Sequence, residues 1–170
     1  MESRMSNEIP GALTSTRAEA IAGYLEGAGV PFEMIEHKPV GSAVAEAHAV
    51  ERSPEKVAKT IVLHDGHAYV VVAISGADRL DLHKLRELLG ASRQLRLAGE
   101  DEIARDFPAL EVGAVPPFGP MLPAAEVIDR ALAEQPEIMC PAGDHRHSVL
   151  VDPRDVVRVT DAKVADICEE

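Results

Sequence analysis

The chain has 170 residues, of which 46% are hydrophobic and 27% charged, a composition typical of one globular domain. Its formal net charge of −12 argues against wide, non-specific binding to the phosphates of DNA or RNA. Aromatic residues make up only 3% and tryptophan is absent, which argues against recognition of single strands by base stacking. Contact with one end of an RNA through a local basic patch stays open.

Two features of the sequence indicate a cytoplasmic protein. Cys140 and Cys168 are too few for a disulfide framework in a chain of this length, so we expect reduced thiols. The first fifteen residues lack the apolar segment of a secretory signal. The longest clean apolar run, 68–74, is far shorter than the roughly 20 residues that span a bilayer, so no membrane partner is expected.

The N-terminal part divides into a tail and the start of a domain. Residues 1–14 are polar and contain Pro10 and Gly11, so we expect a mobile tail. Residues 15–170 are expected to form one domain, because no linker, repeat or low-complexity tract divides them. Its first predicted elements are a helix from Ser15 or Thr16 to Gly29, a strand over 32–37 and an Ala-rich helix over 42–50.

The segment VAKTIVLHDGHAYVVVAIS, residues 57–75, predicts a β-hairpin. Two apolar, β-branched runs are joined by Asp65-Gly66, a pair that favours the positive φ angles of a tight hairpin turn. With a loop of two residues, the predicted cross-strand pairs are His64 with His67, Val62 with Tyr69, Ile61 with Val70 and Lys59 with Val72.

The second half of the chain alternates predicted helices and strands, which indicates an α/β protein. Helices are expected over 81–89, where Gly90 is the stop, and over 100–107, with a Gly- and Pro-rich loop over 112–123. Strands are expected near 127–128, 138–140, 148–151 and 156–159, followed by a C-terminal helix over 162–168.

Between residues 79 and 96, five basic residues stand against two acidic ones, Asp81 and Glu87. This stretch predicts either a local patch for an RNA end or an ordinary solvated helix face. The five basic residues are Arg79, Lys84, Arg86, Arg93 and Arg96.

Lys59 is a charge on an apolar strand face. Side chains alternate along a strand, so Lys59 shares its face with Val57, Ile61 and Leu63. Burying an unpaired ammonium is costly, so a lysine in a pocket needs an anion such as a carboxylate or a ligand phosphate. The alternative is a lysine that extends its ammonium to solvent at the start of the strand.

The segment GAVPPFG, residues 113–119, predicts a rigid loop. Two prolines fix φ and remove N–H donors, while the flanking glycines allow tight turns. The N–H groups of Ala114, Val115 or Phe118 are therefore candidates to hold a carbonyl oxygen or a water molecule. A purely structural Pro-rich turn is the alternative.

The segment AGDHRHS, residues 142–148, contains potential metal ligands. Asp144, His145 and His147, with Cys140 nearby, either form a metal site or are ordinary polar residues of a surface loop. No CxxC or HExxH spacing supplies further ligands, and we expect no metal. The sequence also lacks a GxSxG elbow, a P-loop and a GxGxxG motif.

Taken in order, these segments resemble the YbaK-like family of aminoacyl-tRNA deacylases, which is related to the editing domain of bacterial prolyl-tRNA synthetases. The likeness runs from about Arg17 to about Thr160 and is carried by VPFEMIEH, the hairpin, GAVPPFG and AGDHRHSVLVDPRDVVRVT. It implies a compact α/β domain with a mixed, largely antiparallel, barrel-like sheet and surrounding helices.

The resemblance also implies hydrolysis of the ester that joins a wrong amino acid to a tRNA 3′ end, without a metal, a cofactor or a protein nucleophile. It assigns the catalytic roles to Lys59, which holds the terminal adenosine and its phosphate, and to Gly113, whose loop positions the carbonyl and the water. Pro117 matches the end of the family's Gly-x-x-x-Pro motif. The other residues expected at the substrate are Thr60, Ala114, Val115, Gly143, Asp144 and His147, with Asp129 as a further candidate.

The implied partner is the 3′ end of an aminoacyl-tRNA, with an aminoacyl-tRNA synthetase as a second candidate partner and no DNA. We expect a free-standing enzyme that removes a small amino acid such as Ala, Cys or Ser, from tRNA for proline. The extra proline, Pro116, and the Asp-His-Arg-His run depart from the family pattern and leave the amino acid open. The alternatives are a non-catalytic module that binds tRNA ends or nucleotides, and a metal-dependent enzyme using Cys140, His145 and His147.

Overall fold

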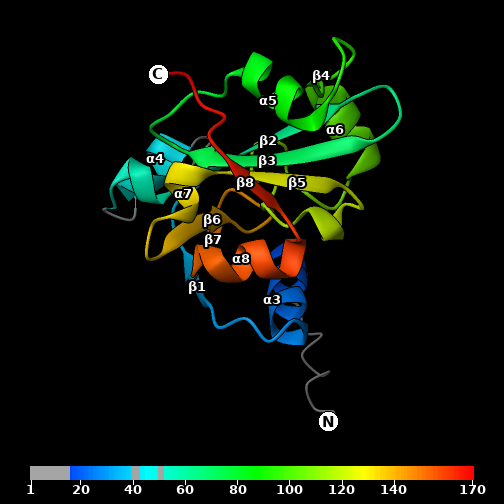
Figure 1. The fold of residues 1–170 in the computed structure, drawn as a ribbon. Helices are drawn as coiled ribbons and strands as arrows, with labels where there is room; N and C mark the ends of the chain where they lie inside the picture. The colour runs from blue at the N-terminus through cyan, green and yellow to red at the C-terminus, as the bar shows by residue number, and fades with distance from the viewer. Residues whose placement is uncertain (1–15, 40–42, 50–51) are drawn as a thin grey trace.

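A computed structural model describes residues 16–39, 43–49 and 52–170 (Figure 1). The predicted tail over 1–14 and the ends of the helix expected over 42–50 lie outside the described residues. The described helices are α3 (Thr16–Gly27), α4 (Ala43–Ala49), α5 (Leu82–Leu89), α6 (Glu100–Asp106), α7 (Arg130–Ala133) and α8 (Pro153–Thr160), with the short 3₁₀ turns η1 (Pro54–Lys56) and η2 (Gly119–Met121).

Within the described residues, the strands form two sheets. The larger has the order β4-β2-β3-β5-β8, in which β2 pairs antiparallel with β3 and β4, whereas β5 pairs parallel with β3 and β8. The smaller is antiparallel, with the order β1-β7-β6. The strands are β1 (Glu33–Glu36), β2 (Ala58–His64), β3 (Tyr69–Ser75), β4 (Arg96–Leu97), β5 (Ala125–Asp129), β6 (Ile138–Pro141), β7 (His147–Val151) and β8 (Lys163–Ala165).

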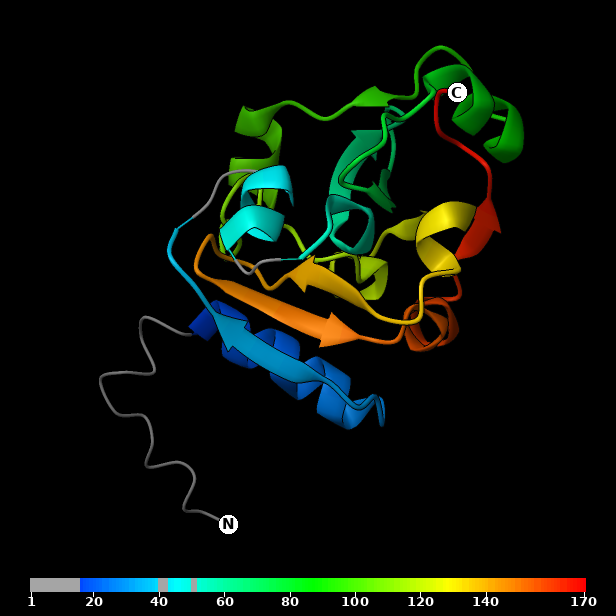
Figure 2. The same cartoon turned by 90° about the vertical axis from the view of Figure 1, so that its left-hand side faces the viewer.

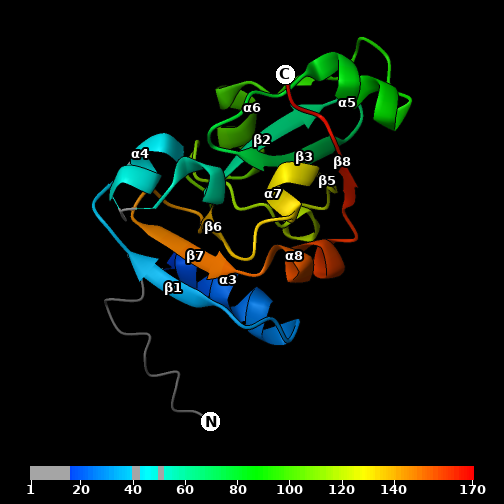
Figure 3. The ribbon, with the colours of Figure 1, turned by 60° about the vertical axis from the view of Figure 1, so that its left-hand side comes forward.

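These pairings confirm the predicted α/β class and the mixed, largely antiparallel strand arrangement. A bridge between Val57 and Met139 links the two sheets, which do not close into a barrel. Both sheets lie between α5 and α6 on one side and α3 and α8 on the other (Figures 1 and 3). None of the described helices is long and apolar enough to cross a membrane.

The main core lies between the two sheets and is covered by α3, which runs along the smaller sheet (Figure 2). A second apolar cluster covers the other face of the larger sheet, where Leu85 of α5 packs with Leu63 and Val72. Strand β3 is thus buried on both faces, which explains its continuous apolar run. The main core includes Ile21, Leu25, Ala58, Ala73, Phe118, Ile128, Ile138, Cys140 and Val149.

The predicted hairpin is present, but its predicted register is wrong. Lys59 pairs with Ile74, Ile61 with Val72, Val62 with Val71, and His64 with Tyr69. The loop therefore has the four residues 65–68. Asp65 stabilises it, because its Oδ1 accepts hydrogen bonds from the N–H groups of His67 and Ala68, both at 2.8 Å. The displacement is by an even number of residues, so each side chain keeps its predicted face.

The last two predicted elements are also wrong, since the segment expected as a strand over 156–159 is helix α8 and the expected helix over 162–168 contains strand β8. Asp152 caps α8 by accepting from Arg154 N at 2.9 Å, and Pro153 occupies its first turn. Val156 and Thr160, four residues apart, are the buried positions of one helix face. The capping by Asp152 and the proline in the first turn favour the helix more than the valines favour a strand.

Removing the N-cap of α5 is expected to lower the free energy of unfolding by about 1 kcal/mol. Asp81 Oδ1 accepts from His83 N at 3.0 Å and from Lys84 N at 3.2 Å, and Asp81→Ala leaves both donors without this acceptor. Urea denaturation measures the change, with the exposed His83→Ala as the control. Equal denaturation midpoints for Asp81→Ala and the wild type would show that the cap contributes nothing.

Candidate functional site

A cavity of about 260 Å³ lies where α4, β2, the 113–119 loop and the loop before β7 meet. Six residues predicted for the site lie on its wall: Lys59, Thr60, Gly113, Ala114, Asp144 and His147. The sequence analysis missed or assigned elsewhere the eight others: His37, Ala43, Glu46, Ala58, Gly76, Pro141, His145 and Ser148.

Lys59 is half-buried on the cavity wall. Its Nζ donates a hydrogen bond to the backbone carbonyl of Asp78 at 3.2 Å. In the part of the chain that the structure describes, no carboxylate lies within ion-pair distance of this ammonium. The positive charge on the cavity wall is thus left without a protein counter-charge, and a phosphate of a ligand would supply one.

Backbone hydrogen bonds connect the start of the 113–119 loop to the loop that contains Gly143. Glu111 N donates to Gly143 O at 2.9 Å, and Gly143 N donates to Ala114 O at 3.0 Å. Ala114 N donates to Glu111 O at 3.0 Å, so this N–H group is not free to hold a substrate. Gly113 is exposed with φ +89°, and its N–H has no partner among the described residues.

Three of the predicted site residues do not line the cavity. Val115 is buried among Val62, Ile103 and Leu122, and Pro117 is buried at the same loop. Gly143 is buried behind the wall, where an added Cβ would come within 3.0 Å of Arg17 Cβ. These residues lie behind the cavity wall, and Gly113 is the lining residue of this loop whose N–H has no partner among the described residues.

Asp144 holds His147. Its Oδ1 accepts from the N–H groups of Arg146 and His147 at 2.8 Å, and both carboxylate oxygens lie 3.0 Å from His147 Nδ1. A carboxylate accepts hydrogen bonds, so His147 carries a proton on Nδ1, and its Nε2 has no partner among the described residues. The arrangement can orient a water molecule or accept its proton.

His37, Ser148 and Glu46 form a hydrogen-bonded chain on the cavity wall. His37 Nε2 lies 2.8 Å from Ser148 Oγ, which makes a short hydrogen bond to Glu46 Oε2. Glu46 is only 4% exposed, and its burial raises the pKa of its carboxyl to about 7 despite the hydrogen bond from Ser148. One sequence feature could have indicated this residue: Glu46 is the only acid in the Ala-rich helix AVAEAHA.

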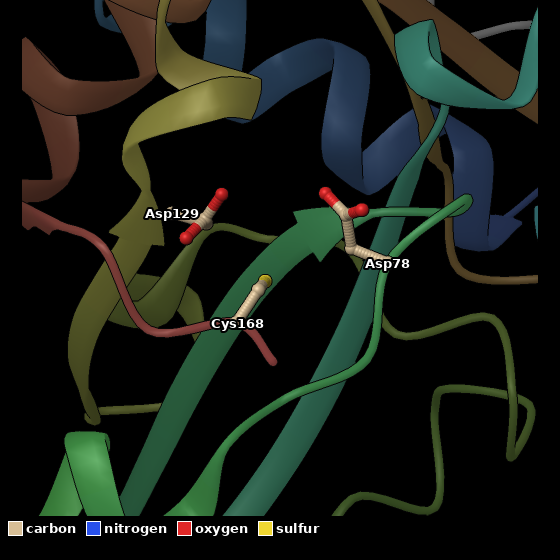
Figure 4. Close-up of side chains that lie close together, drawn as sticks. All are labelled: Asp78, Asp129 and Cys168. Atoms are coloured by element: carbon tan, nitrogen blue, oxygen red, sulfur yellow. The ribbon is translucent and has the colours of Figure 1, made fainter. Parts of the chain in front are cut away.

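Asp129, a further candidate for the site, lies elsewhere, in a cluster with Asp78 and Cys168. The three come from the end of β5, the segment after β3 and the C-terminal segment, and their ligand-type atoms lie within 4.8 Å of one another (Figure 4). Asp129 already accepts from Ala131 N at 3.1 Å and from Ile167 N at 3.0 Å. Burial and the carboxylates of Asp129 and Asp78 raise the pKa of the Cys168 thiol to about 12, so this thiol keeps its proton.

The group Cys140, His145 and His147 does not assemble as a metal site among the described residues. Cys140 is fully buried in the core, whereas His145 and His147 line the cavity. Burial raises the pKa of the Cys140 thiol well above its usual value. These three residues therefore do not supply the joint ligand set on which the metal-dependent alternative depends.

The basic stretch 79–96 is not part of the cavity wall, and two of its five basic residues are ion-paired. Lys84 Nζ lies 3.4 Å from Asp166 Oδ2, and Arg96 pairs with Glu102 at 2.8 Å. Arg86 donates to Leu95 O at 2.7 Å. These contacts favour an ordinary helix face over a patch for an RNA end.

Comparison with known proteins places this geometry in context. Residues 37–159 match the family model of the aminoacyl-tRNA editing domain. A candidate trans-editing enzyme for prolyl tRNA synthetase is 28% identical, with a TM-score of 0.80 over 91% of this chain and 98% of that chain. A scaffold protein computationally designed to present a linear epitope is 27% identical (TM-score 0.79, 91% of this chain and 97% of that), and a hypothetical protein is 26% identical (TM-score 0.79, 88% and 99%). No curated protein matches the sequence.

Proposed function

The chain belongs to the aminoacyl-tRNA editing domain family, and from this premise we propose that it hydrolyses the ester of mischarged aminoacyl-tRNA as a free-standing enzyme. The observation that carries the proposal is the placement of Lys59 and Gly113. They are far apart in the sequence, they line one cavity, and Lys59 brings to it a positive charge with no carboxylate partner among the described residues.

In this proposal each group at the cavity has a separate role. Lys59 binds a phosphate next to the terminal adenosine, and the N–H of Gly113 donates to the ester carbonyl oxygen as negative charge develops on it. His147 Nε2 orients the attacking water. The water oxygen bonds to the carbonyl carbon, the ester bond to the ribose oxygen breaks, and a proton from the water passes to that ribose oxygen. The acceleration comes from orientation and electrostatic stabilisation.

We propose a small amino acid on tRNA for proline as the substrate. A cavity of about 260 Å³ favours small side chains, and a small site excludes larger groups by size. Similarity to a candidate trans-editing enzyme for prolyl tRNA synthetase supports tRNA for proline, and a synthetase as a partner. Ala, Cys and Ser are the amino acids to test first.

The test is deacylation of tRNA for proline charged with Ala, Cys, Ser or Pro. We expect hydrolysis of at least one of the small, wrong amino acids and protection of prolyl-tRNA, because proline is the correct product. Alanine on tRNA for alanine shows whether the tRNA body contributes. Lack of hydrolysis of every charged tRNA would refute the enzymatic function, and tight binding without turnover would favour the non-catalytic tRNA-end module.

A further inference from the structure

Two carboxylates line the cavity, and they differ in what their oxygens bind. Both oxygens of Asp144 are held by His147, and Oδ1 also accepts from two backbone N–H groups. Glu46 uses only Oε2, which contacts Ser148. Its Oε1 has no hydrogen-bond partner in the described part of the chain, so Glu46 supplies the open carboxyl oxygen of this wall.

The protonation of Glu46 is tied to that of His37. His37 Nδ1 lies 2.8 Å from the backbone carbonyl of Lys38, which can only accept, so Nδ1 carries a proton. If Ser148 donates to Glu46, then a doubly protonated His37 donates to Ser148. If Glu46 is protonated and donates to Ser148, then Ser148 donates to a neutral His37.

In both of these states, each contact among His37, Ser148 and Glu46 has one proton to form its hydrogen bond. If Glu46 were ionised and His37 neutral, the contact between His37 Nε2 and Ser148 Oγ would have no proton. Ser148 is only 1% exposed, so water cannot supply a replacement hydrogen bond there. The three hydrogen-bonded side chains therefore share one mobile proton, which lies either at Glu46 or at His37. Glu46 is only 4% exposed, so before a substrate binds burial favours the state in which its carboxyl keeps the proton.

We propose that Glu46 Oε1 binds the α-ammonium group of the aminoacyl ester, and that this binding moves the proton of Glu46 through Ser148 to His37. The O–H bond at Glu46 Oε2 breaks as Ser148 Oγ takes its proton, and the Ser148 hydroxyl proton passes to His37 Nε2. The resulting carboxylate faces the ammonium. This inference rests on the proposed deacylase function and names its substrate class: esters of amino acids whose α-amino group is free.

The charges of the cavity suit such a substrate. Lys59 carries the positive charge for a phosphate, and Glu46 carries the negative charge for the ammonium, so the two ends of the substrate meet opposite signs. No ion pair joins Lys59 to Glu46, so neither charge neutralises the other. His37 is only half-buried, so water can hydrate the charge that it receives. A neutral α-substituent lacks the charge that draws the proton away from Glu46.

The test compares alanyl-tRNA with lactyl-tRNA, in which a hydroxyl of nearly the same size replaces the ammonium. Each rate is divided by the uncatalysed rate, because the two esters differ in intrinsic lability. We expect the wild type to favour the alanyl ester roughly tenfold or more, and Glu46→Gln to abolish this preference by slowing only the alanyl reaction. Glu55→Gln, at an exposed glutamate, is the matched control and should keep the wild-type preference.

Two further measurements separate this role from a structural one. Non-hydrolysable 3′-amide analogues of alanyl- and lactyl-adenosine give the same comparison by affinity, even without turnover. The ¹⁵N shift of His37 Nε2 should move to the protonated value when the alanyl analogue binds to the wild type, and should not move in Ser148→Ala. If neither ester is turned over, the affinities of the two analogues decide the ammonium site, and the deacylase function is judged on the full set of charged tRNAs. An unchanged preference in Glu46→Gln would refute the ammonium site, and a static His37 would refute the proton transfer.

Discussion

Replacing Lys59 with alanine is expected to lower kcat/KM for deacylation by about 10- to 100-fold, which corresponds to the roughly 1.5–3 kcal/mol of a hydrogen bond to a charged group. The ammonium lines the cavity, and its hydrogen bond is to the backbone carbonyl of Asp78, not to a carboxylate. The charge is therefore available to a substrate phosphate. The loss should appear mainly in KM if Lys59 holds the tRNA end equally in the ground and transition states.

Two variants make this result specific to the ammonium. Lys59→Met keeps the apolar stem along the strand and removes the charge, so it should lose as much activity as Lys59→Ala. Lys56→Ala removes an exposed lysine only three positions away and should leave kcat/KM within twofold of the wild type. Full activity in Lys59→Ala, or equal losses in the two alanine variants, would remove Lys59 from the working site.

Local signals in the sequence predicted most of the larger elements correctly. Helix α5 begins at a capping aspartate and ends at Gly90, whose φ of +63° a glycine adopts at little cost. The hairpin followed from two β-branched runs around Asp65-Gly66. Its loop length did not follow, because Asp65 could either flank a two-residue turn or use its side chain to hold a four-residue loop.

The exchanged elements at the C-terminus show where local patterns compete. The segment after Asp152 contains three valines, which favour a strand, but it also contains a capping aspartate followed by proline, which favours a helix. Strand β8 has only three residues and forms by parallel pairing with β5. Such a short edge element depends on a neighbour that is distant in sequence, so no local pattern predicts it.

Part of the site was out of reach of the sequence for the same reason. Lys59, Gly113 and Asp144 were indicated by an unusual charge, a rigid loop and a family resemblance, and they lie on one cavity. The chain from His37 to Ser148 and Glu46 joins residues that are 111 and 102 positions apart. Each is ordinary in its own segment, and only the fold gives them a shared proton.

A second large effect is expected from Glu126, because its burial makes folding stability depend on pH. Glu126 is 4% exposed, its Oε1 accepts from Gly119 N at 2.6 Å, and its Oε2 has no partner among the described residues. Burial raises the pKa of this carboxyl from 4.5 to about 8, against the lowering effect of the Gly119 hydrogen bond. The folded protein thus keeps a proton that the unfolded chain releases above its ordinary pKa.

The sign of the effect follows from proton binding. Between the two pKa values the folded state binds more protons than the unfolded state, so the free energy of unfolding falls as pH rises from 4.5 to about 8. The full loss is at most about 4 to 5 kcal/mol, from 1.36 kcal/mol per pKa unit. Glu126→Gln keeps an oxygen for Gly119 N and cannot ionise, so its stability should fall much less over this range.

Urea unfolding at pH 5 and pH 9 for the wild type and Glu126→Gln measures this difference directly. Glu46, whose carboxyl pKa is also raised, contributes equally to both proteins, so the difference between their pH profiles isolates Glu126. Exposed Glu134→Gln is the matched control and should follow the wild-type profile. Parallel profiles for the wild type and Glu126→Gln would mean that this carboxyl is hydrated despite its burial, since only a solvated carboxylate ionises in the folded state without loss of stability.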